Sequence, residues 1–443
     1  MNKVLIITYY WPPSAGSGVQ RWVKFAKYLP HYNWEPIVFT PENPDFNVKD
    51  ETLAGDISPD LEVLKFPIWE PYQLQRRIAG KKSDSNPADA LEKKKKGIFD
   101  LFSIWLRGNV LIPDPRVFWV KPSVSFLKDV IKRNQIDVVI TTGPPHSMHL
   151  IGEKLKIKTG VKWVADFRDP WSKWEFLDTL KMTPLVRNIH TRLEKRVLQK
   201  ADKVITISNT FKKDFEELVP RRVEVITNGF DPDDFNISGN IEQSEKFLIS
   251  HIGTIDELRD PRPFLYALKQ LVTEIPVLQN EVEVLFVGVV SKKLIAEIEA
   301  DDILNTVVNF KAYVAHHEVF EIYKRSAVLL LVLANSKNAV GNIPGKLFEY
   351  MASEKRILAM GRVDGDSAEI LKNADAGFIC HPGDREAIKG AIQNLFKEYK
   401  SPLPEKNQSI QKYSRKSLTG DLAQILDEII EAGDEKSVYE KNE

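Results

Sequence analysis

The chain has 443 residues, and its 62 basic and 62 acidic side chains give a formal net charge of zero. Hydrophobic residues make up 43% and charged residues 28%, which excludes a wholly disordered chain and allows roughly two to three domains. A balanced charge gives no general attraction to nucleic acid, so nucleic acid is not an expected partner.

The single cysteine, Cys380, excludes an intrachain disulfide and favours a reducing compartment. The longest apolar runs, such as residues 327–334, are far short of the roughly 20 residues that cross a bilayer. Residues 3–8 form too short an apolar run for a secretion signal and instead predict a first buried strand. We therefore expect a cytoplasmic protein.

Short apolar segments rich in β-branched residues alternate with longer amphipathic ones, which is typical of parallel α/β sheets. A first series of predicted strands covers residues 3–8, 36–40, 137–141, 162–166, 203–207 and 224–227. A second series covers 247–253, 282–287, 307–313, 327–333, 356–360 and 377–380, with helical patterns such as 263–275 and 317–325 between them. The sequence predicts an α/β fold with two doubly wound, Rossmann-like domains.

The periodicity breaks at residues 228–245, which contain Gly, Pro and Asp. We predict an N-terminal domain over residues 1–235, a C-terminal domain over 236–407, and a final helix and tail over 408–443. The polar residues 81–97, with a lysine run at 93–96, predict a mobile loop or a solvated helix end.

A glycine-containing turn follows the first predicted strand. Gly16 and Gly18 allow backbone N–H groups to approach a ligand at a helix N-terminus, where the helix dipole favours anions. Arg21 takes the place of the third glycine of the dinucleotide fingerprint, which disfavours a nicotinamide cofactor. A flexible loop without a ligand is the alternative.

The segment Gly143-Pro-Pro-His146 ends another predicted strand, at the edge where ligands of open α/β sheets bind. We expect the His146 imidazole to be exposed to a ligand; the alternative is a helix-capping or packed histidine. His149 lies three residues on, but two histidines without a carboxylate are weak support for a metal site.

Three charged residues, Asp166, Arg168 and Asp169, follow the next predicted strand. Charges at a strand end are costly unless they are paired or used. Either these three residues belong to a ligand-binding site, or Arg168 forms an internal ion pair with one of the two aspartates. Trp171 either forms the wall of a ligand site or is simple packing.

In the second half, Gly253 ends a predicted strand and Arg259 stands just before a predicted helix that starts near residue 261. A guanidinium beside a helix N-terminus is suited to a diphosphate, because its fork matches phosphate oxygens. Arg262 is the second choice for this role, and a solvent-exposed arginine is the alternative.

The segment Pro344-Gly345-Lys346 predicts a helix start whose N–H groups and lysine can meet phosphate. Glu349 lies one helical turn beyond Lys346, and its carboxylate can accept two hydrogen bonds from ribose hydroxyls. The alternative is a surface ion pair between Lys346 and Glu349.

These motifs, with Pro12-Pro13 and Asn228-Gly-Phe-Asp231, resemble the family-four (group one) retaining glycosyltransferases over nearly the whole chain. Residues 142–146 and 166–171 resemble the corresponding segments of a bacterial branch of this family that acts in surface-polysaccharide assembly. The resemblance implies the GT-B fold: two Rossmann-like domains facing a cleft, with a C-terminal helix over 408–430 that crosses back to the first domain.

The resemblance also implies roles. Arg259 takes the place of the cation that binds the donor diphosphate, Lys346 lies at the phosphate-facing helix start, and Glu349 holds the ribose. His146 would orient the sugar and Asp169 would contact the acceptor. The implied catalytic residues are thus His146, Asp169, Arg259 and Lys346, and the implied donor-binding residues are Gly16, Gly18, Gly253, Arg259, Pro344, Gly345, Lys346 and Glu349.

No cofactor or metal is implied; the nucleoside-diphosphate sugar is a substrate, and the acceptor is a saccharide or a lipid-linked saccharide. The family's first glutamate falls on Gly341, and Thr254 replaces its usual basic residue, so the donor sugar stays open. Two alternative functions are a sugar-nucleotide epimerase on the same fold and a non-catalytic nucleotide-sugar-binding protein.

The segment 98–112 carries aromatic residues close to the lysine run 93–96. It either docks peripherally on the inner face of an anionic membrane, near a lipid-linked acceptor, or forms a buried helix of the first domain.

Overall fold

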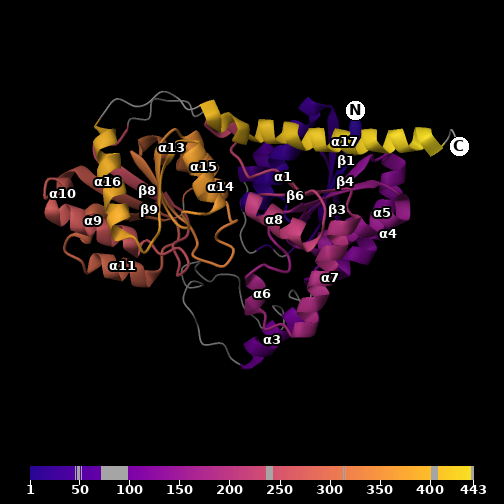
Figure 1. The fold of residues 1–443 in the computed structure, drawn as a ribbon, viewed down its shortest axis with the longest axis horizontal. Helices are drawn as coiled ribbons and strands as arrows, with labels where there is room; N and C mark the ends of the chain where they lie inside the picture. Colours follow the sequence, from indigo (N-terminus) through magenta and orange to yellow (C-terminus); the bar gives the residue numbers. More distant parts are fainter. Residues whose placement is uncertain are drawn as a thin grey trace. The chain divides into compact units, whose positions relative to one another are not determined.

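A computed structural model describes residues 1–44, 46, 50, 52–70, 98–235, 243–312, 314, 316–400 and 408–440. Within these residues the chain forms two compact units (Figure 1). The N-terminal unit runs to Asn228 and takes in the chain again from Arg415; the C-terminal unit runs from Gly229 to Ser414. The loop predicted at 81–97 and most of the linker after residue 235 lie outside the described residues.

The N-terminal unit is built on a seven-stranded parallel sheet with the order β3-β2-β1-β4-β5-β6-β7. Its strands are β1 (Asn2–Ile7), β2 (Trp34–Pro41), β3 (Glu62–Phe66), β4 (Val138–Gly143), β5 (Lys162–Phe167), β6 (Lys203–Thr206) and β7 (Glu224–Val225). Successive side chains of β1 enter different cores, Leu5 and Ile7 on one face and Val4 and Ile6 on the other. The sheet is therefore buried on both faces, as its nearly continuous apolar strands predict.

Helices cover both faces of this sheet (Figure 1). The helices of this unit are α1 (Ser17–Tyr28), η1 (Leu29–Tyr32), η2 (Thr52–Asp56), α3 (Ile98–Asn109), α4 (Val117–Asn134), α5 (Ser147–Thr159), α6 (Phe176–Thr179), α7 (Pro184–Lys200), α8 (Asn209–Leu218) and α17 (Arg415–Glu440).

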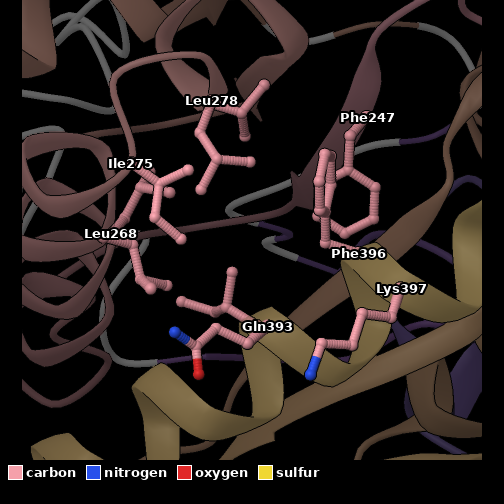
Figure 2. Close-up of a pocket in the computed structure, with 10 residues that line it drawn as sticks. Phe247, Leu268, Ile275, Leu278, Gln393, Phe396 and Lys397 are labelled. Atoms are coloured by element: carbon pink, nitrogen blue, oxygen red, sulfur yellow. The ribbon is translucent and has the colours of Figure 1, made fainter.

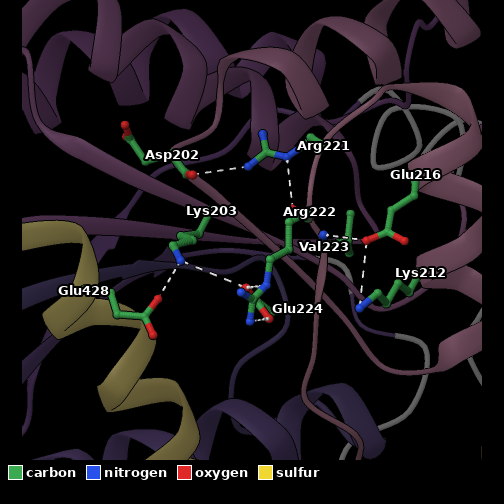
Figure 3. Close-up of polar contacts among 9 residues, drawn as sticks. All are labelled: Asp202, Lys203, Lys212, Glu216, Arg221, Arg222, Val223, Glu224 and Glu428. Atoms are coloured by element: carbon green, nitrogen blue, oxygen red, sulfur yellow. Dashed lines mark hydrogen bonds and ion pairs between the residues drawn. The ribbon is translucent and has the colours of Figure 1, made fainter. Parts of the chain in front are cut away.

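The C-terminal helix α17 packs on the N-terminal unit, beside α1 (Figure 1). Its residues Leu422 and Leu426 are fully buried in the core on the α1 face of the sheet. Trp34 donates its indole N–H to Asp427 at 2.9 Å, and Lys203 pairs with Glu428 at 2.6 Å (Figure 3). The apolar contacts dominate the attachment, because partly exposed ion pairs such as the second contribute little.

The C-terminal unit has a six-stranded parallel sheet with the order β10-β9-β8-β11-β12-β13. Its strands are β8 (Phe247–Ile252), β9 (Val282–Val287), β10 (Val308–Lys311), β11 (Val328–Val332), β12 (Arg356–Met360) and β13 (Gly377–Cys380). Its helices are η4 (Pro232–Phe235), α9 (Arg262–Glu274), α10 (Leu278–Glu281), α11 (Lys292–Glu299), α12 (Leu304–Val307), α13 (His316–Arg325), α14 (Gly345–Ala352), α15 (Asp366–Asn373), α16 (Arg385–Tyr399) and η5 (Gln408–Tyr413). This strand order is that of the doubly wound nucleotide-binding fold.

The prediction of two Rossmann-like domains is confirmed, and every predicted strand is present to within a few residues. The edge strand β3 was missed, because Glu62 and Lys65 interrupt its apolar pattern and its side chains are at most half-buried. No helix among the described residues is both long and apolar enough to cross a membrane.

Candidate functional site

Each sheet reverses its strand order at one point, between β1 and β4 in the N-terminal unit and between β8 and β11 in the C-terminal unit. Ligands of open α/β sheets bind beyond the carboxyl ends of the strands at such a reversal. The predicted site residues fall there in both units, since Gly16, His146 and Asp169 follow β1, β4 and β5. In the C-terminal unit, Gly253 follows β8 and Lys346 opens α14.

Gly253 makes room for the ammonium group of Lys346. Its φ of +141° is disfavoured for residues with a side chain, and a Cβ at this position would collide with Lys346 Nζ. The α14 helix is held at this strand end by Tyr350, whose hydroxyl accepts a hydrogen bond from the Ile252 backbone N–H at 3.2 Å. The fold thus brings the predicted Gly253 and Lys346 into contact.

The Lys346 ammonium has neither a hydrogen bond nor an ion pair within the part of the chain that the structure describes. Burial lowers the pKa of Lys346, nearby Arg259 lowers it further, and Glu349 acts in the opposite direction. The helix also begins without a side-chain cap at Pro344. A half-buried cation at an uncapped helix start is suited to an anionic ligand.

Glu349 accepts a hydrogen bond from Tyr323 at 3.1 Å. Burial, and then the Glu349 carboxylate, raises the pKa of Tyr323, so the phenol stays protonated and remains a donor. The alternative of an ion pair between Lys346 and Glu349 is not formed in the described structure.

Arg259 is held in a turn by Asp256. The Asp256 carboxylate accepts hydrogen bonds from the Arg259 backbone N–H at 2.9 Å and from its guanidinium at 2.7 Å. The Arg259 side chain is still 40% exposed and lies close enough to Lys346 to depress its pKa. Arg262 instead pairs with Asp260 and Glu297 and is thereby occupied.

In the N-terminal unit, Asp166 is fully buried and its partners are all internal. It accepts hydrogen bonds from the Arg21 guanidinium at 3.1 Å, the Trp22 indole at 3.1 Å and the Thr142 hydroxyl at 2.8 Å. Arg21 also donates to the Thr227 carbonyl. The predicted internal ion pair therefore exists, but with Arg21 in place of Arg168.

The expectation that His146 is exposed is wrong. Its ring is only 6% exposed and stacks on Trp171 at a centroid distance of 4.7 Å and an angle of 3°. Trp171 is itself buried, and its indole donates to His190 at 2.9 Å. The favourable stacking of these aromatic rings outweighs exposure of the imidazole, so both residues are packing elements here.

Both ring nitrogens of His146 are enclosed without a partner among the described residues. Burial lowers the pKa of His146, and the neighbouring His149 and His190 lower it further. Burial likewise lowers the pKa of His149 to about 3, and its Nδ1 lies 2.9 Å from the Thr141 hydroxyl. These imidazoles are therefore neutral at physiological pH.

Gly16 and Gly18 do lie at the start of α1, but a side chain of the protein covers the second. Gly16 has a φ of +118° and begins the helix without a side-chain cap. A Cβ at Gly18 would collide with the Arg168 guanidinium, which also donates to the Pro144 carbonyl. Arg168 thus places a cation over the helix start, a contact that sequence spacing could not reveal.

Asp169 has no hydrogen bond or ion pair among the described residues. Burial raises the pKa of Asp169, nearby Arg168 lowers it, and Asp166 raises it. Since Asp169 follows β5 at the ligand-binding edge, its carboxylate is available to accept a hydrogen bond from a ligand.

An apolar cavity of about 320 Å³ lies at the other edge of the C-terminal sheet (Figure 2). Phe247 and Val282, the first residues of β8 and β9, line it together with side chains of α9, α10 and α16. Gln393 and Lys397 are its polar lining residues. A phosphate-bearing ligand needs several fixed hydrogen-bond donors, so this apolar cavity does not fit one, and it lies away from Gly253 and Lys346.

Two family models match the sequence of this chain. Residues 87–234 match the family model described as Glycosyltransferase Family 4, and residues 233–417 match the one described as Glycosyl transferases group 1. The chain therefore belongs to the glycosyltransferases, with a Family 4 domain followed by a group 1 domain. No curated protein matches it in sequence.

Several solved structures have the same fold. A glycosyltransferase from Rickettsia africae is 15% identical with a TM-score of 0.62, over 97% of this chain and 98% of that one. Sucrose-phosphate synthase from Thermosynechococcus elongatus is 14% identical with a TM-score of 0.63, over 98% and 100%. HepE from Anabaena, solved in complex with UDP, is 13% identical with a TM-score of 0.57, over 99% and 100%. At these identities the likeness shows the GT-B fold.

Sequence reasoning missed His251, Asp256 and Tyr323, which surround the predicted donor-binding residues. A polar residue inside an apolar strand was the available signal for His251, which stands two residues before Gly253. Asp256 stands three residues before Arg259, a spacing at which opposite charges can pair, so a local signal was available for it. Tyr323 gave no signal, because it lies 26 positions from Glu349.

Proposed function

We propose that the chain transfers a glycosyl group from a nucleoside-diphosphate sugar to an acceptor hydroxyl, with retention of the anomeric configuration and without a metal ion. The half-buried Lys346 ammonium, which has no ionic partner among the described residues, carries this proposal. Its place beside Gly253, at the strand-order reversal of a group 1 domain, is where a donor diphosphate would sit.

In the proposed reaction the bond between the anomeric carbon and the diphosphate oxygen breaks, and a bond from the acceptor oxygen to that carbon forms. The departing phosphate takes the proton of the acceptor hydroxyl, so no protein base is required. Lys346 and Arg259 stabilise the negative charge that develops on the leaving group. Gly345 and Pro344 open the helix that faces the phosphate, and Glu349 accepts hydrogen bonds from the ribose.

On the N-terminal unit, we propose that Asp169 contacts the acceptor. We also propose that the start of α1 at Gly16 and Gly18, with Arg168 beside it, forms an anion-binding subsite. His146 was predicted to orient the sugar. Because its ring is enclosed beneath Trp171, we propose that it positions the loop that carries Asp169.

We further propose an acceptor that is a saccharide or a lipid-linked saccharide, in cell-surface polysaccharide or glycolipid assembly in the cytoplasm. The helix α3 supports a peripheral membrane contact. Its Leu101, Trp105 and Leu106 are exposed, and so is Val110 directly after it. Exposed aromatic and aliphatic residues on one helix favour insertion at a membrane surface.

The decisive experiment incubates the purified chain with a panel of nucleoside-diphosphate sugars and measures nucleotide release, with and without a polyprenyl-linked saccharide. Acceptor-dependent release is expected for one donor, with UDP-sugars tested first because HepE was solved with UDP. Conversion to an epimeric sugar without release would support an epimerase, and binding without cleavage of any donor would support a binding protein. Either result would overturn the proposal.

The variant Arg259→Ala should lower turnover about one hundredfold, because it removes a cation that stabilises the leaving diphosphate. Its melting temperature should change little, since the side chain is partly exposed. Arg362→Ala is the matched control, because Arg362 is also partly exposed and pairs with a nearby aspartate, Asp364. Wild-type turnover in Arg259→Ala would reject the role of Arg259.

A further inference from the structure

His251 lies near the end of β8 and is almost fully buried. Its Nδ1 lies 2.9 Å from the carbonyl oxygen of Leu330 in β11, across the strand-order reversal. A carbonyl oxygen can only accept, so Nδ1 carries the hydrogen. Burial, Lys346 and Arg259 lower the pKa of His251 to about 3, so the ring is neutral and Nε2 holds a lone pair.

The Nε2 atom faces the space that the Lys346 ammonium occupies. The Cβ that Gly253 lacks would lie 3.7 Å from His251 Nε2 and 3.4 Å from Lys346 Cε, and it would collide with Lys346 Nζ. Nε2 is enclosed and has no hydrogen-bond donor among the described residues. A buried acceptor without a donor is costly, and the ammonium is the cation at the same small space.

We infer that His251 is a positioning residue: its neutral Nε2 lies beside the Lys346 ammonium, outside hydrogen-bond geometry in this structure, and its lone pair orients the ammonium at the phosphate site. This inference rests on the proposed function and deepens it. An imidazole acceptor fixes the ammonium without cancelling its charge, whereas a carboxylate in the same place would neutralise it. The Glu349 carboxylate is engaged by Tyr323, which favours His251 as the group that orients the lysine.

The ionisable groups around Lys346 are Arg259 from the loop after β8, Glu349 on α14 and His251 on β8. Arg259 disfavours the ammonium form and Glu349 favours it. A lone-pair acceptor also favours the ammonium form, so its loss lowers the pKa of Lys346. A variant without this acceptor should therefore lose diphosphate binding at a lower pH than the wild-type protein, because its Lys346 loses its charge at a lower pH.

Two substitutions separate positioning from a structural role. His251→Asn places its amide near the position of Nδ1, so it can keep the bond to Leu330 but loses the acceptor at Nε2. His251→Gln reaches the position of Nε2, so it can keep the acceptor but loses the bond to Leu330. A purely structural role predicts that the asparagine variant resembles wild type, and positioning predicts that the glutamine variant does.

The probe is UDP, and its affinity is measured by calorimetry between pH 6 and about pH 10, a range that includes the ordinary pKa of lysine. We expect His251→Asn to bind UDP about tenfold more weakly and to lose binding at a lower pH, because the acceptor beside the Lys346 ammonium is removed. We expect His251→Gln to stay within about twofold of wild type, although its melting temperature falls. Wild-type affinity in His251→Asn, or equal losses in both variants, would overturn the inference.

A second measurement needs no nucleotide. The rate at which an amine reagent acetylates Lys346, followed by mass spectrometry as a function of pH, gives the pKa of Lys346 in the full chain. The pKa should fall in His251→Asn and hold in His251→Gln; an unchanged pKa in His251→Asn would overturn the inference. Failure of the wild-type chain to bind any nucleotide would instead reject the proposed function, so the two failures are distinguishable.

Discussion

The two sheets present charged side chains at the same edge, and they treat them in opposite ways. In the N-terminal unit, the Asp166 carboxylate is fully buried and accepts hydrogen bonds from three side chains. In the C-terminal unit, the Lys346 ammonium is half-buried and has no ionic partner among the described residues.

The difference separates structural charges from those kept for a ligand. A buried charge with a complete set of partners is held by them, and removing one partner is strongly destabilising, whereas a buried charge without partners lowers stability until something binds. Position at the ligand edge of the sheet is therefore insufficient to identify a site residue. The number of internal partners distinguishes structural charges from charges that are available to a ligand. By this measure Asp166 is structural, whereas Lys346 and Asp169 belong to the candidate site.

Asp166→Asn should have the largest effect on stability. The amide cannot accept all three hydrogen bonds, and the Arg21 guanidinium, which is 1% exposed, would keep its charge without a carboxylate. Breaking a buried ion pair from one side typically costs about 3–5 kcal/mol. We expect a loss of that size in the free energy of unfolding, measured by urea denaturation.

The control for this variant is Asp129→Asn on α4, because Asp129 is 68% exposed. Its free energy of unfolding should stay within about 0.5 kcal/mol of wild type. If Asp166→Asn were equally mild, the contrast between paired and unpaired charges would lose its basis.

The sequence alone predicts the fold well, because parallel strands buried on both faces are nearly continuous apolar runs. Strands such as β9 and β12 have the predicted bounds, whereas β3 at the sheet edge was not predicted. The ligand edge was also predictable, since residues that follow a strand in a doubly wound sheet lie at that edge.

The long-range partners of the charged residues were not predictable. Asp166 binds Arg21, which lies 145 positions away, and only the folded sheet brings them together. His146 was expected at the surface because it follows a strand, but stacking on Trp171 buries it. Long-range side-chain contacts depend on packing that no local pattern encodes, so sequence spacing could identify charges at the edge without separating structural from available ones.

In contrast to Asp166→Asn, which should lower stability, Asp169→Asn should raise stability and lower activity. Loss of the charge should lower turnover with a lipid-linked acceptor about tenfold, because a hydrogen bond to a carboxylate is weakened. The free energy of unfolding at neutral pH should rise, since burial makes the charged form unfavourable in the folded state. Turnover is measured by nucleotide release and stability by urea denaturation.

The pH dependence of stability gives a sharper test of Asp169. Its pKa in the folded state is raised, so between the unfolded value and the folded value the folded state binds more protons. Its contribution to stability is therefore present at low pH and is lost as the pH rises through the folded pKa. The difference in unfolding free energy between wild type and Asp169→Asn should grow over this interval; a constant difference would contradict the assignment.

The exposed tryptophan of α3 extends the comparison to apolar side chains. Trp171 is enclosed with His146, whereas Trp105 is 41% exposed beside the exposed Leu101 and Leu106. If exposure of apolar side chains on α3 serves a membrane, Trp105→Ala should reduce binding to phosphatidylglycerol vesicles about fivefold, because apolar area that inserts at the membrane surface is lost.

Trp69→Ala is the matched control, since Trp69 is 57% exposed, lies outside α3 and packs edge-on against Phe118 at 5.0 Å. Vesicle binding is measured by sedimentation at two salt concentrations, because attraction to anionic lipid weakens with ionic strength. Equal losses in both variants would show that any exposed tryptophan adds to adsorption. A loss confined to Trp105→Ala would assign the contact to α3, and with it the route by which a lipid-linked acceptor could reach Asp169 in the same unit.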